Sequence, residues 1–228
     1  MPSPKDRLLD AALPHVAFDG WSQTTFRAAV EASGLTPAQA RAACPRGALD
    51  LATHFHARGD GEMVRRLRAE DLSDLRYRDR VIRALRLRIE IAGRHREAVR
   101  RGITLFALPQ HAPDGLRALW STSDAVWQAL GDRSTDVNWY TKRGTLSGVY
   151  SATVLYWLGD TSEGSRDTWA FLERRVDDVM KIEKAKAEVR RSPVLSRLMA
   201  GPNMLLDRIK APPRGPRSDL PGAWTDPE

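Results

Sequence analysis

Apolar residues recur every three or four positions along most of the chain, and this helical period limits the possible folds more than any other feature. Stretches with the alternating period of β-strands are scarce, and short clusters of Gly, Pro, Asp and Ser separate the periodic segments. The pattern predicts an all-α fold of about nine or ten helices. No run approaches the roughly 18 consecutive apolar residues of a membrane-spanning helix.

Three short helices joined by tight turns are expected at the N-terminus. The first covers residues 5–18 and includes Pro14, which lacks an N–H donor, so we expect a kink there. The second ends at Gly34, a residue that tolerates the left-handed conformation of a helix end. The third begins at Thr36, where the run Thr-Pro-Ala-Gln combines an N-cap, a first-turn proline and a capping box.

This order of helices and turns over residues 5–44 is similar to the N-terminal part of tetracycline-repressor-like regulators. A helix that reads DNA needs side chains that reach base edges and phosphates. The third helix offers only Gln39 and Arg41 for this purpose. The resemblance therefore implies a helix-turn-helix head that has the shape of a repressor head without its contact chemistry, and DNA is not an expected partner.

The formal net charge of +7 favours a polyanionic neighbour, which is either nucleic acid or an anionic lipid surface. Ten arginines lie between Arg76 and Arg101, against three acidic residues. Their spacing covers most of the helical surface away from the apolar stripe. Two interpretations stay open: a solvated face, and a phosphate-binding patch for lipid head groups or nucleic acid.

Most of the aromatic residues fall between residues 103 and 180, where they follow helical stripes. Such stripes form either an ordinary core or the wall of a cavity for a long apolar ligand. Under the second interpretation, the candidate ligand-binding residues are Trp120, Tyr150, Val154, Trp169 and Leu172.

The run Gly-Asp-Arg-Ser-Thr-Asp-Val-Asn-Trp-Tyr-Thr-Lys-Arg at residues 131–143 is the most distinctive motif of the chain. Its polar residues mark a helix start with Ser134 or Asp136 as the N-cap, and a tryptophan in such a first turn is expected at the surface. Together with Leu-Pro-Gln-His-Ala-Pro at 108–113 and Asp-Thr-Trp-Ala-Phe-Leu-Glu-Arg-Arg-Val at 167–176, this run resembles the lipid-binding accessory protein family of coenzyme Q (ubiquinone) biosynthesis. The resemblance extends from residue 5 to about residue 185.

The resemblance implies a non-enzymatic function on a repressor-like fold, without a cofactor. Members of this family bind isoprenoid quinone precursors in a hydrophobic pocket and present them to the di-iron hydroxylase of the pathway. A homodimer formed through the last helices of the bundle is also implied. Where the family has a bulky residue before the first tryptophan of its contact surface, this chain has Val126. Carried over by position, the surface that contacts the hydroxylase comprises Trp127, Asp136, Trp139 and Tyr140.

A separate amphipathic segment follows the bundle. At about 100° per residue, six of its apolar residues fall within an arc of about 120°. This profile is typical of a helix that lies in a membrane interface, although docking on the body of the protein or on a second subunit fits it too. The pair Gly201-Pro202 is expected to kink or divide the helix. The candidate membrane-binding residues are Leu195, Leu198, Met199, Leu205, Leu206 and Ile209.

Four segments follow from these patterns. They are a degenerate helix-turn-helix head at 1–48, a lipid-binding helical bundle at 49–190, an amphipathic membrane-surface helix at 191–211 and a disordered basic tail at 212–228. The first five residues show no signal or transit peptide, so we expect a cytoplasmic protein, peripheral on the inner face of the cytoplasmic membrane.

Sequence patterns of catalysis and metal binding are missing. His54 and His56 project about 200° apart on a helix, which does not suit a metal site, and Cys44, the single cysteine, excludes a disulfide scaffold. Neither a glycine-rich phosphate loop nor a Ser/His/Asp signature occurs. These absences agree with the function that the resemblance implies, a lipid-binding protein that is not an enzyme. The alternative is a ligand-responsive regulator that binds DNA, which the fold and the basic charge favour.

Overall fold

The computed structural model of the protein describes residues 2–191 and 210–212, with side chains for 2–181 and 210–212. This part of the chain folds into nine α-helices and two short 3₁₀ turns without a strand, so the predicted all-α fold is confirmed. The six candidate residues of the predicted membrane-surface helix and most of the basic tail lie outside the described residues. Of the predicted helix range 191–211, only residues 191, 210 and 211 are described, and Lys210 and Ala211 are not helical.

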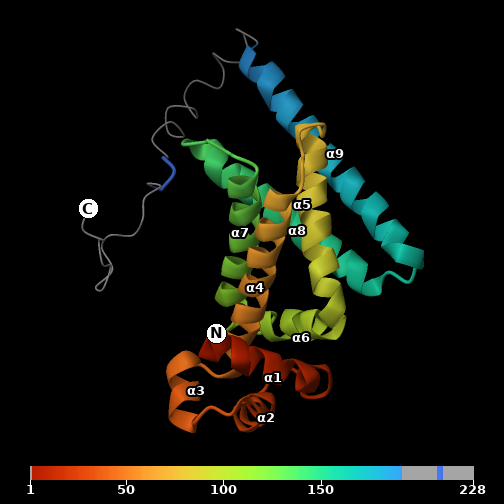
Figure 1. Ribbon diagram of the computed structural model, residues 1–228. Helices are drawn as coiled ribbons and strands as arrows, with labels where there is room; N and C mark the ends of the chain where they lie inside the picture. The colour runs from red at the N-terminus through yellow and green to blue at the C-terminus, as the bar shows by residue number, and fades with distance from the viewer. Residues whose placement is uncertain (1, 192–209, 213–228) are drawn as a thin grey trace.

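Three short helices form a head at one end of the molecule (Figure 1). The Thr36 capping box forms as predicted: the Gln39 N–H donates to Thr36 Oγ1 at 3.2 Å, and the Thr36 N–H donates to Gln39 Oε1 at 2.9 Å. The first helix contains Pro14 and continues beyond it to Asp19. The helices of the head are α1 (Pro4–Asp19), α2 (Gln23–Ser33) and α3 (Pro37–Ala43).

Six further helices make up the rest of the described structure, and α6 crosses beneath the others next to the head (Figure 1). The 3₁₀ turn Gly93–His95 redirects the chain from α5 into α6, and a second turn, Glu163–Ser165, precedes α9. The helices are α4 (Ala48–Ala69), α5 (Tyr77–Ala92), α6 (Arg96–Phe106), α7 (Ala112–Ala129), α8 (Val137–Gly159) and α9 (Arg166–Arg191).

The head and the bundle have separate hydrophobic cores that meet at α6. In the head, Leu8, Phe26 and Cys44 are buried, and the bundle core is built around residues such as Leu85. The indole of Trp21 joins the two, because its Nε1 donates to the Ala98 carbonyl of α6 at 3.0 Å in a buried position. No helix within 2–191 is both long enough and apolar enough to span a bilayer.

The arginines of α5 and α6 do not form a purely solvated face, which was one interpretation of their spacing. Many of them bind carboxylates or carbonyls of other helices: Arg83 holds Glu70 with bonds of 2.6 and 2.7 Å, and Arg100 donates to the Leu158 carbonyl at 2.8 Å. Arg88 is 3% exposed. These arginines therefore hold helices together, a role that the periodicity of a single helix does not reveal.

Candidate functional site

An apolar cavity lies where α6 crosses the bundle beside the head. Its volume is about 400 Å³, and residues of α4, α5, α6, α7 and α8 line it together with Trp21. Helices α6 and α7 approach closely because Gly115 has no side chain: a Cβ there would stand 2.8 Å from the Cβ of Phe106. Such a cavity suits an apolar ligand. Its lining includes Phe55, Ile103, Leu119, Val154 and Trp157.

His56, Arg88 and Tyr150 bring polar groups into this apolar wall. Arg88 Nε donates to Asp60 Oδ1 at 2.7 Å, and Arg88 Nη2 donates to the His56 carbonyl at 3.1 Å. The Thr122 hydroxyl donates to Asp60 Oδ1 at 2.9 Å and lies 2.7 Å from His56 Nε2, so the imidazole donates to the hydroxyl. The network holds His56 and Arg88 in fixed positions at the cavity.

The state of these groups follows from their burial. Tyr150 is 4% exposed, and its hydroxyl forms no hydrogen bond with any described residue. Burial raises the pKa of Tyr150, so the phenol keeps its proton at neutral pH. Burial lowers the pKa of His56 to about 4, so this imidazole is neutral. The cavity thus offers a phenol donor that a carbonyl or hydroxyl oxygen of a ligand can accept.

The five sequence-predicted ligand-binding residues do not all meet at this cavity. Tyr150 and Val154 line it, whereas Trp120, Trp169 and Leu172 do not. Leu172 is fully buried in the bundle core, and Trp169 lies under the Arg86 guanidinium, with 4.7 Å between Cζ and the ring centroid. Sequence reasoning missed His56, Arg88 and the lining from α6. The available signal was Gly59 in the middle of α4, because a glycine there indicates a residue packed closely against the helix.

A second feature is an aromatic cluster at the start of α8. The rings of Trp120 and Trp139 lie 5.7 Å apart, those of Trp139 and Tyr140 lie 4.7 Å apart, and Tyr140 is 38% exposed. Asp136 caps the helix by accepting from the Asn138 N–H at 3.1 Å, which decides between the two predicted caps. The cluster is therefore part of the surface, and its tryptophan in the first helical turn is only half-buried.

Buried charges support this cluster from beneath. The fully buried Arg143 lies 4.0 Å from the centroid of the Trp139 ring, and its Nε donates to Asp124 Oδ1 at 2.6 Å. Lys142 Nζ donates to Asp132 Oδ1 at 2.8 Å. Burial alone raises the pKa of Asp132, but hydrogen bonds from Lys142 and Ser134 outweigh it and hold that pKa at about 2. These ion pairs fix the loop that carries the motif.

The described residues 210–212 also lie against this surface. The Ala211 N–H donates to the Thr135 carbonyl at 2.8 Å, and the Tyr140 hydroxyl donates to the Lys210 carbonyl at 3.4 Å. The last two residues of the predicted membrane helix therefore lie at the start of α8.

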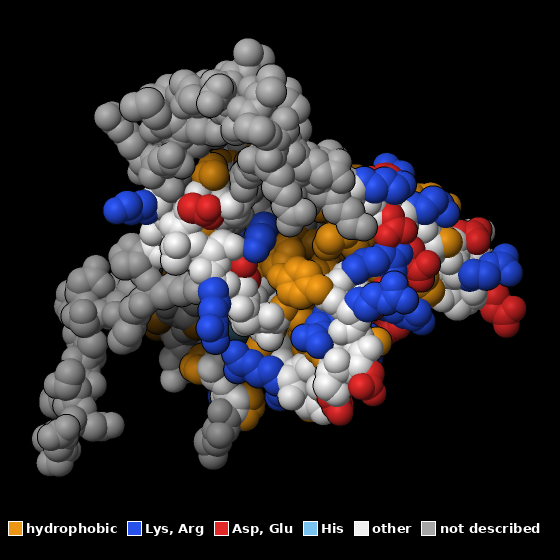
Figure 2. Space-filling model, turned by 90° about the horizontal axis from the view of Figure 1, so that it is seen from above, with side chains coloured by type: hydrophobic (Ala, Val, Ile, Leu, Met, Phe, Trp, Pro, Cys, Tyr) orange, Lys and Arg blue, Asp and Glu red, His pale blue; other side chains and the backbone are white. Residues whose placement is uncertain are grey.

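Trp127 does not share the exposed patch in which the sequence places it. It is 6% exposed and stacks on Tyr77 with 5.9 Å between ring centroids. Both residues line a small apolar hollow of about 210 Å³ between α5, α7, α8 and α9. Seen from the end of the molecule opposite the head, hydrophobic side chains gather in the middle of the surface, with lysine and arginine beside them (Figure 2). The patch is corrected to Asp136, Trp139 and Tyr140, because Trp127 packs inward.

The head gives little support to DNA reading. Gln39 is one of the two predicted contact residues, and its side-chain oxygen is occupied by the capping box of α3. Arg41 is exposed, but α3 has only seven residues. The expectation of a head without contact chemistry stays a prediction.

Comparison with known proteins adds an independent observation. Residues 112–183, which cover α7, α8 and the described side chains of α9, match the family model COQ9. This region belongs to the COQ9 family. The resemblance to the accessory family of coenzyme Q biosynthesis is thereby confirmed.

The COQ9 relatives extend the similarity beyond that region. The chain is 32% identical over 183 residues to "Ubiquinone biosynthesis protein COQ9, mitochondrial" of Drosophila melanogaster, covering 78% of this chain and 55% of the relative. It is also 32% identical over 191 residues to the human protein of the same name, covering 81% of this chain and 60% of the relative. The chain thus spans somewhat more than half the length of these curated relatives.

A solved structure similar to this chain is a TetR transcriptional regulator from Nitrosomonas europaea, with a TM-score of 0.61 and 21% identity over 76% of this chain and 95% of that chain. The likeness confirms the tetracycline-repressor-like fold. At this identity it shows the fold alone.

The expected location is contradicted by the comparisons. The COQ9 relatives are named mitochondrial proteins, so the placement on the inner face of the cytoplasmic membrane was wrong. The cytoplasmic part of that prediction used only the first five residues, which carry no positive information about the compartment.

Proposed function

We propose that this protein acts in ubiquinone biosynthesis as a non-catalytic lipid-binding protein that holds an isoprenoid quinone precursor in the cavity beside α6. The observation that carries the proposal is the composition of the cavity: an apolar wall that includes the buried Tyr150, whose hydroxyl has no partner among the described residues. The relatives named for ubiquinone biosynthesis support the pathway.

The chemistry of a quinone precursor matches this wall. Its isoprenoid tail is a hydrocarbon, and each buried CH₂ group contributes about 0.8 kcal/mol to binding. Its aromatic head carries oxygens, which accept a hydrogen bond from the Tyr150 phenol. A cavity of about 400 Å³ is at the small end of the usual range for ligand sites, so it accommodates a head group and part of a tail rather than a complete long chain.

A binding role fits these polar groups better than catalysis does. His56 is neutral and donates to Thr122, and Arg88 is fixed by Asp60, so both already have protein partners. With its pKa lowered to about 4 by burial, the His56 imidazole is a weak base at neutral pH, where an efficient general base has a pKa near the operating pH. Here the groups are arranged to orient a ligand.

The surface formed by Asp136, Trp139 and Tyr140 is the proposed contact for the pathway's di-iron hydroxylase. Exposed aromatic side chains on a rigid support are typical of binding hot spots. The same proposal assigns membrane lipid to the segment 191–211, which rejoins this surface at Lys210.

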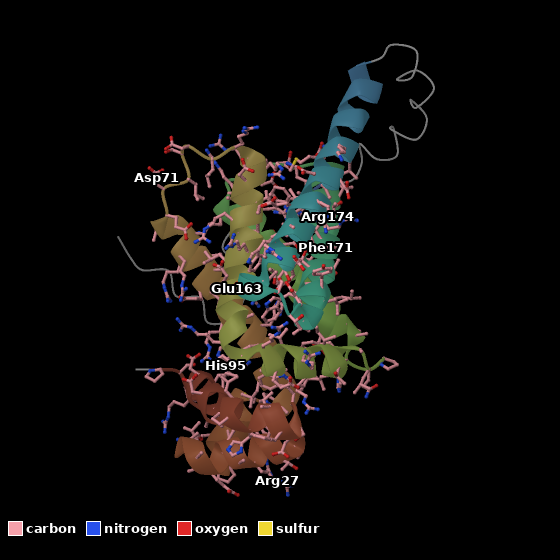
Figure 3. All side chains as sticks on the ribbon, turned by 90° about the vertical axis from the view of Figure 1, so that its right-hand side faces the viewer. Arg27, Asp71, His95, Glu163, Phe171 and Arg174 are labelled. Atoms are coloured by element: carbon pink, nitrogen blue, oxygen red, sulfur yellow. The ribbon has the colours of Figure 1, made fainter. Side chains whose placement is uncertain are left out.

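A homodimer through α8 and α9 belongs to the same proposal. Leu155 is 58% exposed on α8, and Tyr156 stacks on Phe171 of α9 with 4.6 Å between the ring centroids. Figure 3 shows Phe171 and Arg174 on the same stretch of α9. Exposed apolar residues on neighbouring helices are suited to pack against a second subunit.

Lipid extraction tests the proposal. The purified full-length protein should release polyprenylated aromatic lipids that mass spectrometry identifies. Val154→Trp fills the cavity and should abolish their recovery, whereas Ala42→Trp adds the same indole to an exposed position of α3 and should leave it unchanged. Equal lipid recovery from the two variants would refute the assignment of the cavity.

A further inference from the structure

A second cavity adjoins the apolar one, between α4, α5 and the turn that follows α5. Its volume is about 800 Å³, and it is strongly cationic. Figure 3 places His95, one of its lining residues, just above the head at the turn between α5 and α6. The charged side chains that line this basic cleft are Arg58, Arg65, Arg66, Arg88, Arg94 and Glu62.

The acidic residues nearby do not neutralise the basic cleft. Glu62 pairs with both Arg65 and Arg66, while Asp10 pairs with Arg58 at 2.6 Å. Asp60 pairs with Arg88. Counting these three carboxylates against the five arginines leaves two positive charges. Arg94 is exposed and forms no ion pair within the part of the chain that the structure describes.

Arg88 connects the basic cleft with the apolar cavity. It lines both, as do Phe55 and Ala92. Its Nε and Nη2 have protein acceptors, but Nη1 forms no hydrogen bond with any described residue although the side chain is 4% exposed. A buried guanidinium with a free donor at the junction of the two spaces is suited to an anion.

Two glycines in the middle of α4 keep this region open. Glycine in a helix interior costs about 0.5–1 kcal/mol relative to alanine, so each needs a reason. At Gly59 a Cβ would stand 2.8 Å from Arg88 Cζ, which explains the glycine by the close approach of the guanidinium. At Gly61 a Cβ would meet no atom within 4 Å, so packing does not explain it. Gly61 lines the basic cleft, and its missing side chain leaves that space free.

We propose that the basic cleft binds a phosphate or diphosphate group, and that when this group belongs to a lipid, the apolar part of the lipid lies in the adjoining cavity. Guanidinium groups donate paired hydrogen bonds to phosphate oxygens, and the two positive charges that the carboxylates leave unbalanced are of the size that a diphosphate ester neutralises. The inference rests on the proposed function only for the apolar part of the ligand. The phosphate has two kinds of source: a lipid, either a prenyl diphosphate or a phospholipid, and a free phosphate.

The test measures binding to the full-length protein by calorimetry. Farnesyl diphosphate and farnesol share one isoprenoid chain and differ in the diphosphate. Farnesyl diphosphate should bind at least about tenfold more tightly than farnesol. The double variant Arg65→Ser/Arg94→Ser should remove most of this difference without changing farnesol binding, since both side chains are exposed and the fold does not depend on them. The control Arg27→Ser/Arg41→Ser lowers the charge equally on the head, where Figure 3 shows Arg27, and should bind as the wild type does.

Further ligands identify the source of the phosphate. Inorganic diphosphate that binds as tightly as farnesyl diphosphate, with the same sensitivity to the Arg65/Arg94 change, would support the site and assign it to a free anion. A short-chain phosphatidylglycerol that binds more tightly than farnesyl diphosphate would support the site and assign it to phospholipid. Equal affinities for farnesyl diphosphate and farnesol, or a double variant that binds like the control, would overturn the proposal. If only farnesol and quinone precursors fail to bind, the proposed function fails and the basic cleft stands.

His95 provides a second readout that does not depend on affinity. Burial and the neighbouring charges of Arg58 and Arg94 lower the pKa of His95, while Asp10 raises it slightly against them. A bound diphosphate adds negative charge beside the ring and should raise this pKa, which NMR titration of the imidazole measures. An unchanged titration curve in saturating farnesyl diphosphate would place the anion elsewhere and overturn the proposal.

Discussion

Replacing Tyr150 with phenylalanine separates the stability of the protein from its binding of ligand. The substitution removes one hydroxyl and keeps the ring that packs in the bundle core. Because that hydroxyl has no hydrogen-bond partner among the described residues, its loss breaks no bond within the protein. We therefore expect the free energy of unfolding to change by less than about 1 kcal/mol, since no hydrogen bond within the described protein is lost.

The same substitution should weaken ligand binding. A hydrogen bond between the phenol and a ligand oxygen contributes about 0.5–1.5 kcal/mol, which corresponds to a loss of roughly 2- to 13-fold in affinity. Urea denaturation measures the stability, and calorimetry with a short-chain prenylated quinone measures the affinity. The matched control is Tyr156→Phe, on the same helix but 40% exposed and outside the cavity. A Tyr150→Phe protein that unfolds much more easily, or that binds the quinone as tightly as Tyr156→Phe does, would refute the reasoning.

Three further predictions follow from burial and charge. Trp139→Ala should lower the free energy of unfolding by about 1–2 kcal/mol in urea denaturation, less than the roughly 3–5 kcal/mol expected for Trp127→Ala, which removes a buried ring. It should also weaken hydroxylase binding at least about tenfold. Equal stability costs for the two variants would place Trp139 in the core. The folded-state pKa of His56, about 4, lies below its ordinary value of 6.5, so stability present above pH 6.5 should decline as the pH falls towards 4, and His56→Gln should flatten this decline in a pH series of urea midpoints. The pKa of Asp132, about 2, is also depressed, so its contribution should be present above about pH 4 and disappear towards pH 2; an unaltered acid limb in Asp132→Asn would contradict this.

Sequence alone determined the features that depend on neighbours within about one helical turn. The Thr36 capping box and the Asp136 cap join groups two or three residues apart, so local propensity is enough to predict them. The helical period likewise predicted the all-α fold. The motif at residues 131–143 led to the correct family because it is a local run of residue types.

Tertiary structure decided what the helices do with their side chains. Trp120 and Trp127 share one face of α7 by their spacing, yet one joins the surface cluster with Trp139 and the other stacks on Tyr77. The cavity and its polar wall depend on bonds such as that between Arg88 and Asp60, which lie 28 residues apart in the chain. Periodicity indicates which side of a helix is apolar, but packing between helices that are distant in the sequence decides which neighbour that side contacts. In this protein the packing places Arg88 in the walls of both cavities.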